Sequence, residues 1–219
     1  MPECFYTETG KKVPAVTAEQ MRAVDQIAVT ETGPNLYQMM ENAGRSLAEL
    51  AVAVLGKGWQ KANIVVLAGS GGNGGGGICA ARHLANRNAR VRLCLVNPNR
   101  LGEVPAFQRK TFRFAGGREI EASRLPGEGV DLIVDAMIGY GLKSALRRPT
   151  RELIGWANAV QATILALDVP SGVDSTSGAT PGAFIHPNWT LTLALPKTGL
   201  LPERTGSLFL ADLGIPAET

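Results

Sequence analysis

The sequence predicts an α/β protein in which helices cover both faces of a parallel sheet. Two observations carry this prediction. From residue 63 onward, short apolar runs rich in β-branched residues alternate with segments of helical periodicity, and such runs are typical of buried strands. The spacing of these segments fits successive strand–helix–strand units, which place their strands parallel to one another.

The N-terminal part of the chain is predicted to be helical. Thr17 and Gln20 have the spacing of a capping box, so a helix is expected over 16–29. A second, longer helix is expected over 36–55 and is ended by Gly56. The apolar positions of the first helix fall on one face and are Met21, Val24, Ile27 and Ala28.

The rest of the chain supplies the sheet. Because no repeat or low-complexity linker divides the sequence, residues 1–219 are predicted to form a single domain. Residues 1–14 carry charges without an apolar centre and are predicted to be a flexible leader. The strands are expected over 63–69, 89–97, 130–139, 161–172, 189–196 and 207–214, with helices over 78–87, 104–116 and 150–160 between them.

The composition predicts no nucleic-acid partner and no membrane span. The net charge of +3 is small, and the basic residues are scattered rather than gathered in a stripe. No apolar run has the length of a membrane span. Cys4, Cys79 and Cys94 do not have metal-ligand spacing, and the last two are expected to be buried thiols, which fits a reducing cytoplasm.

Histidine is too rare to suggest a histidine-based site. Only two histidines occur, and His83 lies on a predicted amphipathic helix, where a structural role is expected. A catalytic triad or a zinc site is therefore not predicted. Acid–base chemistry would fall to carboxylates or lysine.

A glycine-rich segment follows the first predicted strand. Seven of the nine residues from Gly69 to Gly77 are glycine, and G-x-G-x-x-G is satisfied between a strand and a helix, as in a dinucleotide-binding loop. Asn97 ends the next strand where an acidic residue would hold a ribose, which argues against a conventional hydride-transfer site. No Lys-Ser or Lys-Thr follows the glycines, so the segment is not a Walker A loop. We expect a ligand to approach the bare backbone here.

Polar residues stand at other predicted strand ends. Asp135 comes late in the third strand, Asp168 ends the fourth, and Lys197 follows the fifth. Each alone is compatible with a turn residue. Because the carboxyl ends of parallel strands meet at one edge of a sheet, these side chains should converge with Asn73.

Five motifs occur in order between about Thr17 and Ile215: MENAG, GSGGNGGGG, DAMIGYGL, LDVPSGVD and LPKTGLL. This series resembles the YjeF N-terminal domain family, the NAD(P)H-hydrate epimerases. The resemblance implies a Rossmann-like three-layer αβα sandwich with a mostly parallel central sheet. It also implies an enzyme that interconverts the R and S forms of hydrated NADH and NADPH, so that a separate dehydratase can repair both. Family members often dimerise, so a homodimer is expected.

The resemblance also assigns site residues by position. The family's potassium site falls on Asn73, Asp135 and Ser171, which are oxygen donors of the kind a hard cation prefers, and one K⁺ per subunit is expected. Three positions depart from the family pattern, because Gly76 replaces an aspartate and Tyr140 and Ser144 replace threonine and glycine. Substrate contacts fall on Asp168 and on two segments: Asn73, Gly74, Gly75, Gly76 and Gly77, and Gly139, Tyr140, Gly141, Leu142, Lys143, Ser144 and Ala145.

The reaction suggests roles for two of these residues. The hydrate carries a hydroxyl next to the ring nitrogen, so expelling it leaves a delocalised cation, and water returning to the other face inverts the centre. A fixed carboxylate would stabilise that cation and handle the water's proton, which suits Asp168. Lys197 or Lys143 would assist departure of the hydroxyl.

Two other functions fit the same sequence. The main alternative is a non-catalytic nucleotide-binding or protein-interaction module of the same fold, in which Gly76 marks lost activity. A conventional NAD-dependent dehydrogenase ranks third.

Overall fold

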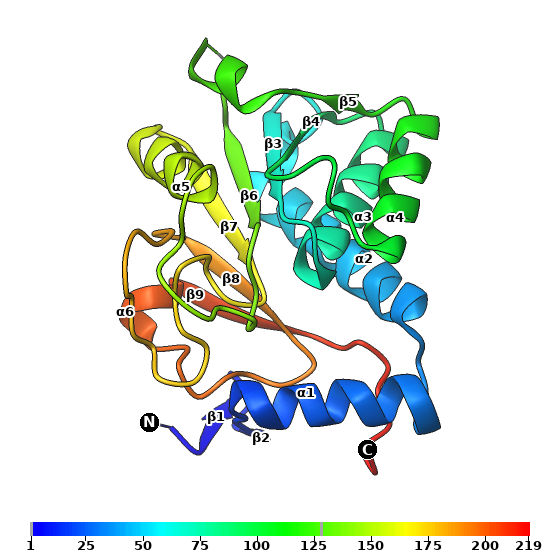
Figure 1. Ribbon diagram of the computed structural model, residues 1–219, viewed down its shortest axis with the longest axis vertical. Coiled ribbons are helices and arrows are strands. Elements are labelled where there is room, and N and C mark those ends of the chain that lie inside the picture. The colour runs from blue at the N-terminus through cyan, green and yellow to red at the C-terminus, as the bar shows by residue number, and fades with distance from the viewer. Residues whose placement is uncertain (1, 128) are drawn as a thin grey trace.

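A seven-stranded parallel sheet forms the centre of the protein, whose computed structural model describes residues 2–127 and 129–219. The strand order is β5-β4-β3-β6-β7-β8-β9, and each neighbouring pair is parallel. The chain runs outward from β3 through β4 to β5 and then returns to the other side of β3 as β6 (Figure 1). Such a reversal opens a crevice at the carboxyl ends of the strands. The strands are β3 (Asn63–Ala68), β4 (Arg90–Leu95), β5 (Arg118–Glu119), β6 (Leu132–Ala136), β7 (Thr163–Leu167), β8 (Trp189–Leu193) and β9 (Ser207–Ala211).

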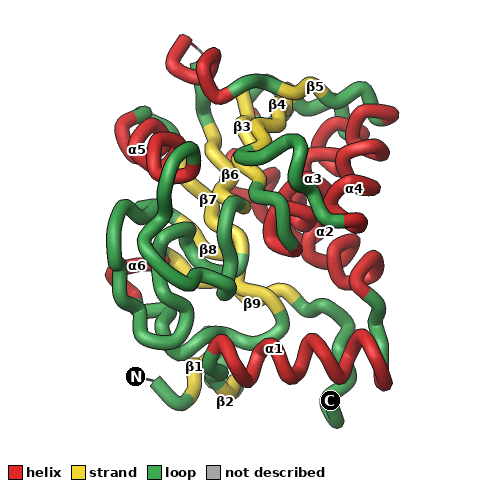
Figure 2. Tube along the Cα trace, viewed as in Figure 1, coloured by secondary structure: helices red, strands yellow, loops and turns green. Residues whose placement is uncertain are grey.

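Helices cover both faces of the sheet. Helices α2, α3 and α4 pack on one face, whereas α5 and a short 3-10 helix, Ala122–Gly127, pack on the other (Figure 2). This confirms the predicted three-layer αβα sandwich. None of the described helices is both long and apolar enough to cross a membrane. The helices are α1 (Ala18–Ile27), α2 (Leu36–Leu55), α3 (Gly72–Asn86), α4 (Glu103–Phe114), α5 (Thr150–Ala159) and α6 (Pro202–Thr205).

The core explains the continuous apolar runs of the sequence. On β3, Ile64 and Val66 pack toward α2, α3 and α4, whereas Val65 and Leu67 pack toward α5. Because both faces of the parallel sheet are covered, the five residues of β3 that follow Asn63 are all buried and apolar.

The capping box predicted at the start of the first helix is confirmed. Thr17 Oγ1 accepts from the Gln20 backbone N–H at 3.2 Å, and the Gln20 side chain returns a bond to the Thr17 N–H at 2.8 Å. Helix α1 ends at Ile27 and continues as a π-helical turn, Ala28–Thr32. In Figure 1, α1 crosses the lower part of the molecule, below β9.

The N-terminal segment differs from the prediction of a flexible leader. Strands β1 (Cys4–Tyr6) and β2 (Lys12–Pro14) form an antiparallel hairpin, and Met1 lies outside the described residues. The chain that follows is held as well, because the Val16 N–H donates to the Pro196 carbonyl at 3.0 Å. The leader prediction is therefore wrong over β1 and β2. Few apolar residues mark this segment in the sequence. Backbone pairing between β1 and β2 forms the hairpin, and Phe5 packs against the buried cluster of Val169, Val173 and Leu200.

The glycine-rich segment also differs from its prediction as a loop. Helix α3 begins at Gly72 rather than at residue 78, so most of the glycines are helical. Their role is close packing. A Cβ at Gly75 would overlap the Met40 sulfur of α2, and one at Gly77 would overlap the Ala136 Cβ of β6. The bare helix thus lies directly against its neighbours, and this packing offsets the poor helix propensity of glycine.

Gly77→Ala is expected to destabilise the protein by about 1–3 kcal/mol, because the added methyl group would overpack the α3–β6 contact. Gly155→Ala is the matched control, since Gly155 also lies inside a helix but has open space where a Cβ would stand. That change is expected to stabilise by about 0.5–1 kcal/mol. Urea unfolding would measure both free energies. Equal effects of the two substitutions would contradict the packing explanation.

Candidate active site

A cleft of about 480 Å³ opens at the carboxyl ends of β3, β6 and β7, where the crevice was expected. Residues 69–73, which lead from β3 into α3, form one wall, and residues 137–141 after β6 form another. Met39 and Met40 of α2 add apolar surface. The volume lies in the range of about 300–1,000 Å³ that is usual for small-molecule sites.

Asp168 and Lys197 form a buried ion pair at this cleft. Lys197 Nζ lies 2.5 Å from Asp168 Oδ1 and donates to the Leu193 carbonyl at 2.8 Å. The Lys197 side chain is fully buried, whereas Asp168 lines the cleft. Asp168 directly follows β7 with a φ of 67°, a left-handed conformation that an aspartate tolerates better than most residues. Such backbone strain is concentrated at functional sites.

The second oxygen of Asp168 is fixed by the turn after β6. The Tyr140 backbone N–H donates to Asp168 Oδ2 at 3.1 Å. A Cβ at Gly139 would lie only 2.8 Å from this same oxygen, so the approach requires glycine. The carboxylate is therefore held in one orientation by a charge on one side and a backbone donor on the other.

Asp135 and Ser171 meet beside the same turn. Asp135 accepts from the Ser171 hydroxyl at 2.6 Å, from the Ser171 N–H at 2.8 Å and from the Met137 N–H at 3.2 Å. Burial raises the pKa of Asp135 to about 6, and these hydrogen bonds oppose the shift. A fully buried carboxyl satisfied by neutral donors would gain from a nearby cation.

Asn73 lies on the other side of the turn. A Cβ at Gly139 would be 3.1 Å from Asn73 Cγ, so the side chain lies against this turn. Its amide oxygen and nitrogen are buried, and among the described residues neither has a hydrogen-bond partner. Buried polar groups are normally paired. Asn73 therefore has unused donor and acceptor capacity at the cleft.

The remaining predicted residues divide into two groups. Gly76, Gly139, Tyr140 and Gly141 line the cleft, whereas Lys143 is exposed on the turn beyond it. Of the two lysines proposed from sequence, only Lys197 contacts Asp168. The predicted substrate-contact residues that do not line the cleft are Gly74, Gly75, Gly77, Leu142, Lys143, Ser144 and Ala145. Asp135, Ser171 and Lys197 are also absent from its lining.

Sequence reasoning missed Asp25 of α1, which also lines the cleft. The Tyr140 hydroxyl donates to Asp25 Oδ2 at 2.5 Å. Burial is the main cause that raises the pKa of Asp25, and burial likewise raises the pKa of Tyr140. A signal was present, because Asp25 stands four positions after Met21 and three before Ala28, on the apolar face of the helix.

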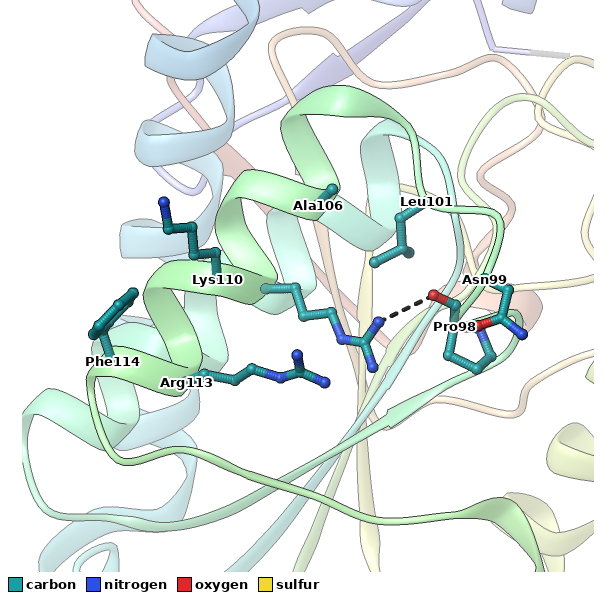
Figure 3. A pocket seen from close by; sticks show the side chains of 8 residues that line it. Pro98, Asn99, Leu101, Ala106, Lys110, Arg113 and Phe114 are labelled. Atoms are coloured by element: carbon teal, nitrogen blue, oxygen red, sulfur yellow. Dashed lines mark hydrogen bonds between the residues drawn. The ribbon is translucent and has the colours of Figure 1, made fainter.

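A second hollow, of about 610 Å³, lies beside α4 (Figure 3). Arg109 donates to the Pro98 carbonyl at 3.0 Å, and both Arg109 and Arg113 pair with Glu119. The hydrogen bond from Arg109 is the chief cause that lowers the pKa of Glu119 to about 2. None of the predicted site residues lines this hollow, and its arginines are already paired. The cleft at the strand ends is therefore the candidate active site.

His83 belongs to a polar group between α2 and α3. Its Nε2 lies 2.8 Å from Glu41 Oε1, and Arg82 Nη2 lies 2.5 Å from Glu41 Oε2. Cys79 is adjacent, and burial is the main cause that raises the pKa of its thiol to about 12. Arg82 supplies positive charge within this group. Because Glu41 belongs to α2 and its partners belong to α3, these contacts connect the two helices.

The fold and the cleft define a Rossmann-like α/β protein with a cleft of small-molecule size where the strand order reverses. The chain belongs to the family described as YjeF-related protein N-terminus, whose sequence profile matches residues 36–199. This confirms the family resemblance of the motifs. The matched segment contains Asn73, Asp135, Asp168 and Lys197, whereas Asp25 lies before it.

Relatives of known name cover nearly the whole chain. An NAD(P)H-hydrate epimerase of Dehalogenimonas lykanthroporepellens is 51% identical, with 97% of this chain and 86% of that protein covered. A bifunctional NAD(P)H-hydrate repair enzyme Nnr of Salinibacter ruber is 36% identical, and the match covers 93% of this chain but only 41% of that protein. A yeast protein of known crystal structure matches with a TM-score of 0.76 over 85% of this chain and 83% of that one. At 24% sequence identity, this last likeness supports the fold alone.

Lys197→Met is expected to lower the free energy of unfolding by about 3–5 kcal/mol, because it leaves the buried Asp168 carboxylate without its counter-charge. Combining it with Asp168→Asn should restore most of the loss. Arg148→Met is the control, since Arg148 and Glu152 form an exposed pair worth about 0.3–0.5 kcal/mol. Denaturant unfolding of the set provides the measurement. A double variant no more stable than Lys197→Met would count against the pair.

Proposed function

We propose that this protein is an NAD(P)H-hydrate epimerase, which interconverts the R and S forms of hydrated NADH and NADPH. The observation that carries the proposal is the placement of Asp168, fixed by Lys197 and by the Tyr140 N–H, in the cleft where the strand order reverses. The names of the relatives support the same activity.

The cleft offers what epimerisation of the hydrate requires. Loss of the hydroxyl creates positive charge on the ring, and a carboxylate already held in place stabilises such charge without reorganising. Asp168 supplies that carboxylate and also accepts the proton of the water that returns. Lys197 is a positioning residue, because its fully buried ammonium group contacts Asp168 and is not among the residues that line the cleft.

We also propose a K⁺ site next to the cleft, formed by Asn73, Asp135 and Ser171. The unpaired amide of Asn73 and the buried carboxyl of Asp135 support it, and all three residues offer the oxygen atoms that a hard cation prefers. When bound, the ion would offset the buried charge of Asp135 and fix the turn after β6 that positions Asp168.

The wider setting is part of the same proposal. A homodimer is proposed because two-fold assembly is the commonest closed arrangement of like chains. The functional partner of the epimerase would be a separate dehydratase that consumes the S-hydrate. The buried unpaired thiols of Cys79 and Cys94 fit a reducing cytoplasm.

The non-catalytic module remains the second candidate, because Gly76 and Tyr140, both departures from the family pattern, line the cleft. One assay separates the two functions. R-hydrate is incubated with the protein and a dehydratase specific for the S form. Consumption of R-hydrate above its spontaneous rate supports the epimerase, and persistence at that rate supports the module.

Asp168→Asn is expected to lower the rate in this assay by a factor on the order of 10²–10³, because the amide keeps the shape of the side chain but loses the charge. Equilibrium binding of the dinucleotide should change much less. Glu152→Gln, which alters an exposed carboxylate on α5, is the control and should match wild type. An Asp168→Asn variant as fast as wild type would remove Asp168 from the chemistry.

Potassium is expected to raise the melting temperature relative to tetramethylammonium at equal ionic strength. Because burial raises the pKa of Asp135 to about 6, ionising it costs stability as the pH rises through that value. K⁺ binds the ionised form, so its benefit should be larger at about pH 7.5 than at about pH 5. Asp135→Asn should abolish the difference between the salts. Identical melting of the wild type in both salts at both pH values would argue against the site.

A further inference from the structure

The cleft contains a second carboxyl group besides that of Asp168. Asp25 comes from α1, far in sequence from the strand ends, and it lines the cleft together with Tyr140. The Tyr140 hydroxyl donates to Asp25 Oδ2 at 2.5 Å, a short hydrogen bond. The phenol therefore connects the turn after β6 with a carboxyl on α1.

The two carboxyl groups of the cleft have contrasting surroundings. Asp168 pairs with the ammonium group of Lys197 at 2.5 Å, whereas the partner of Asp25 is a neutral phenol. Burial and the nearby negative charge of Asp168 raise the pKa of Asp25, while the bond from Tyr140 and the charge of Lys197 act in the opposite direction. Two carboxyl groups held in different environments are the usual arrangement of an acid and a base in one site.

The charged groups around the phenol are also defined. Lys197 Nζ and Arg22 Cζ each lie 5.8 Å from the centre of the Tyr140 ring. Lys197 donates two of its three ammonium protons to Asp168 and the Leu193 carbonyl, and its fully buried side chain is not among those that line the cleft. Tyr140 lines the cleft, its hydroxyl group carries a proton, and that hydroxyl is hydrogen-bonded to the Asp25 carboxyl group.

Epimerisation of the hydrate needs such a proton donor. The departing hydroxyl is a poor leaving group unless a proton reaches it as the carbon–oxygen bond breaks. Asp168 is placed to act on the cation and on the returning water. The reaction therefore also needs a second group in the cleft that donates a proton to the departing hydroxyl oxygen.

We propose that the Tyr140 hydroxyl, hydrogen-bonded to Asp25, donates the proton that converts the departing hydroxyl into water. This inference rests on the proposed epimerase function. In the reacting state Asp25 is protonated and donates to the Tyr140 hydroxyl, which has turned its own proton from Asp25 Oδ2 toward the departing oxygen. The carbon–oxygen bond breaks with its electron pair on oxygen, the Tyr140 proton moves to that oxygen, and the Asp25 carboxyl proton moves to Tyr140. Water then adds to the ring and gives a proton to Asp168. Exchange with solvent returns this proton to Asp25, so a complete cycle gains and loses none.

In this scheme Tyr140 is the catalytic residue and Asp25 is a positioning residue that supplies the proton through it. Tyr140→Phe removes the hydroxyl but retains the ring that faces Lys197 and Arg22. It is expected to lower the turnover rate by a factor on the order of 10²–10⁴ while dinucleotide affinity changes little. Asp25→Asn should also slow turnover.

The pH profile distinguishes proton supply from a structural tether. Wild-type activity should fall as rising pH removes the Asp25 proton, and this alkaline decline should disappear in Asp25→Asn. Asp25→Glu, which keeps a carboxyl group, should restore part of the decline and of the rate. If the Tyr140–Asp25 hydrogen bond only holds α1 in place, Asp25→Asn and Asp25→Glu lower the melting temperature, and the pH profile of activity keeps its wild-type shape.

Tyr37→Phe is the matched control. The Tyr37 hydroxyl also donates to a carboxylate, Glu103, at 3.0 Å, but neither residue lines the cleft. Its activity and profile should match those of the wild type. If Tyr140→Phe does not fold, Asp25→Asn decides by its pH profile.

The outcomes separate this inference from the function on which it rests. A wild-type protein that does not exceed the spontaneous rate overturns both. An active wild type accompanied by a folded, equally active Tyr140→Phe overturns the inference and leaves the epimerase intact. Slow turnover in Tyr140→Phe with retained binding, together with the altered profile of Asp25→Asn, supports it.

Discussion

The contact between Lys197 and Asp168 is the interaction on which the geometry of the cleft depends. It joins the end of β7 to the segment after β8, and Val16 pairs beside Lys197, so the N-terminal segment is fastened at the same point. A buried pair of this kind contributes little net stability, since desolvation offsets attraction. What it provides is orientation, because a carboxylate with one satisfied geometry cannot turn away from the cleft.

The glycines of α3 also determine the geometry of the cleft, from its opposite wall. Glycine adds nothing to helix stability, but it lets α3 lie so close to β6 and α2 that Asn73 lies against the turn holding Asp168. A bulkier helix would stand farther from the sheet and widen the cleft. The site is thus formed by two close approaches, one of a charge pair and one of bare backbone.

Much of this arrangement could be predicted from sequence, for identifiable reasons. Strands such as β3 and β7 are buried on both faces and read as continuous apolar runs, and parallel strand ends must converge, so the meeting of Asp168 with Lys197 was foreseeable. The start of α3 was not, because local propensity excludes a glycine helix that tertiary packing permits. Asp25 was missed because the path of α1 across the molecule is set by long-range contacts.

The walls of the cleft come from widely separated parts of the chain, from Asp25 near its beginning to Leu213 near its end. During synthesis, therefore, the cleft remains incomplete until the last strand has emerged from the ribosome and paired with β8. A nascent chain without β9 would have an incomplete cleft, however well its first strands had formed. A small molecule that binds in the cleft would then stabilise only those chains in which both Asp25 and Leu213 have reached their places.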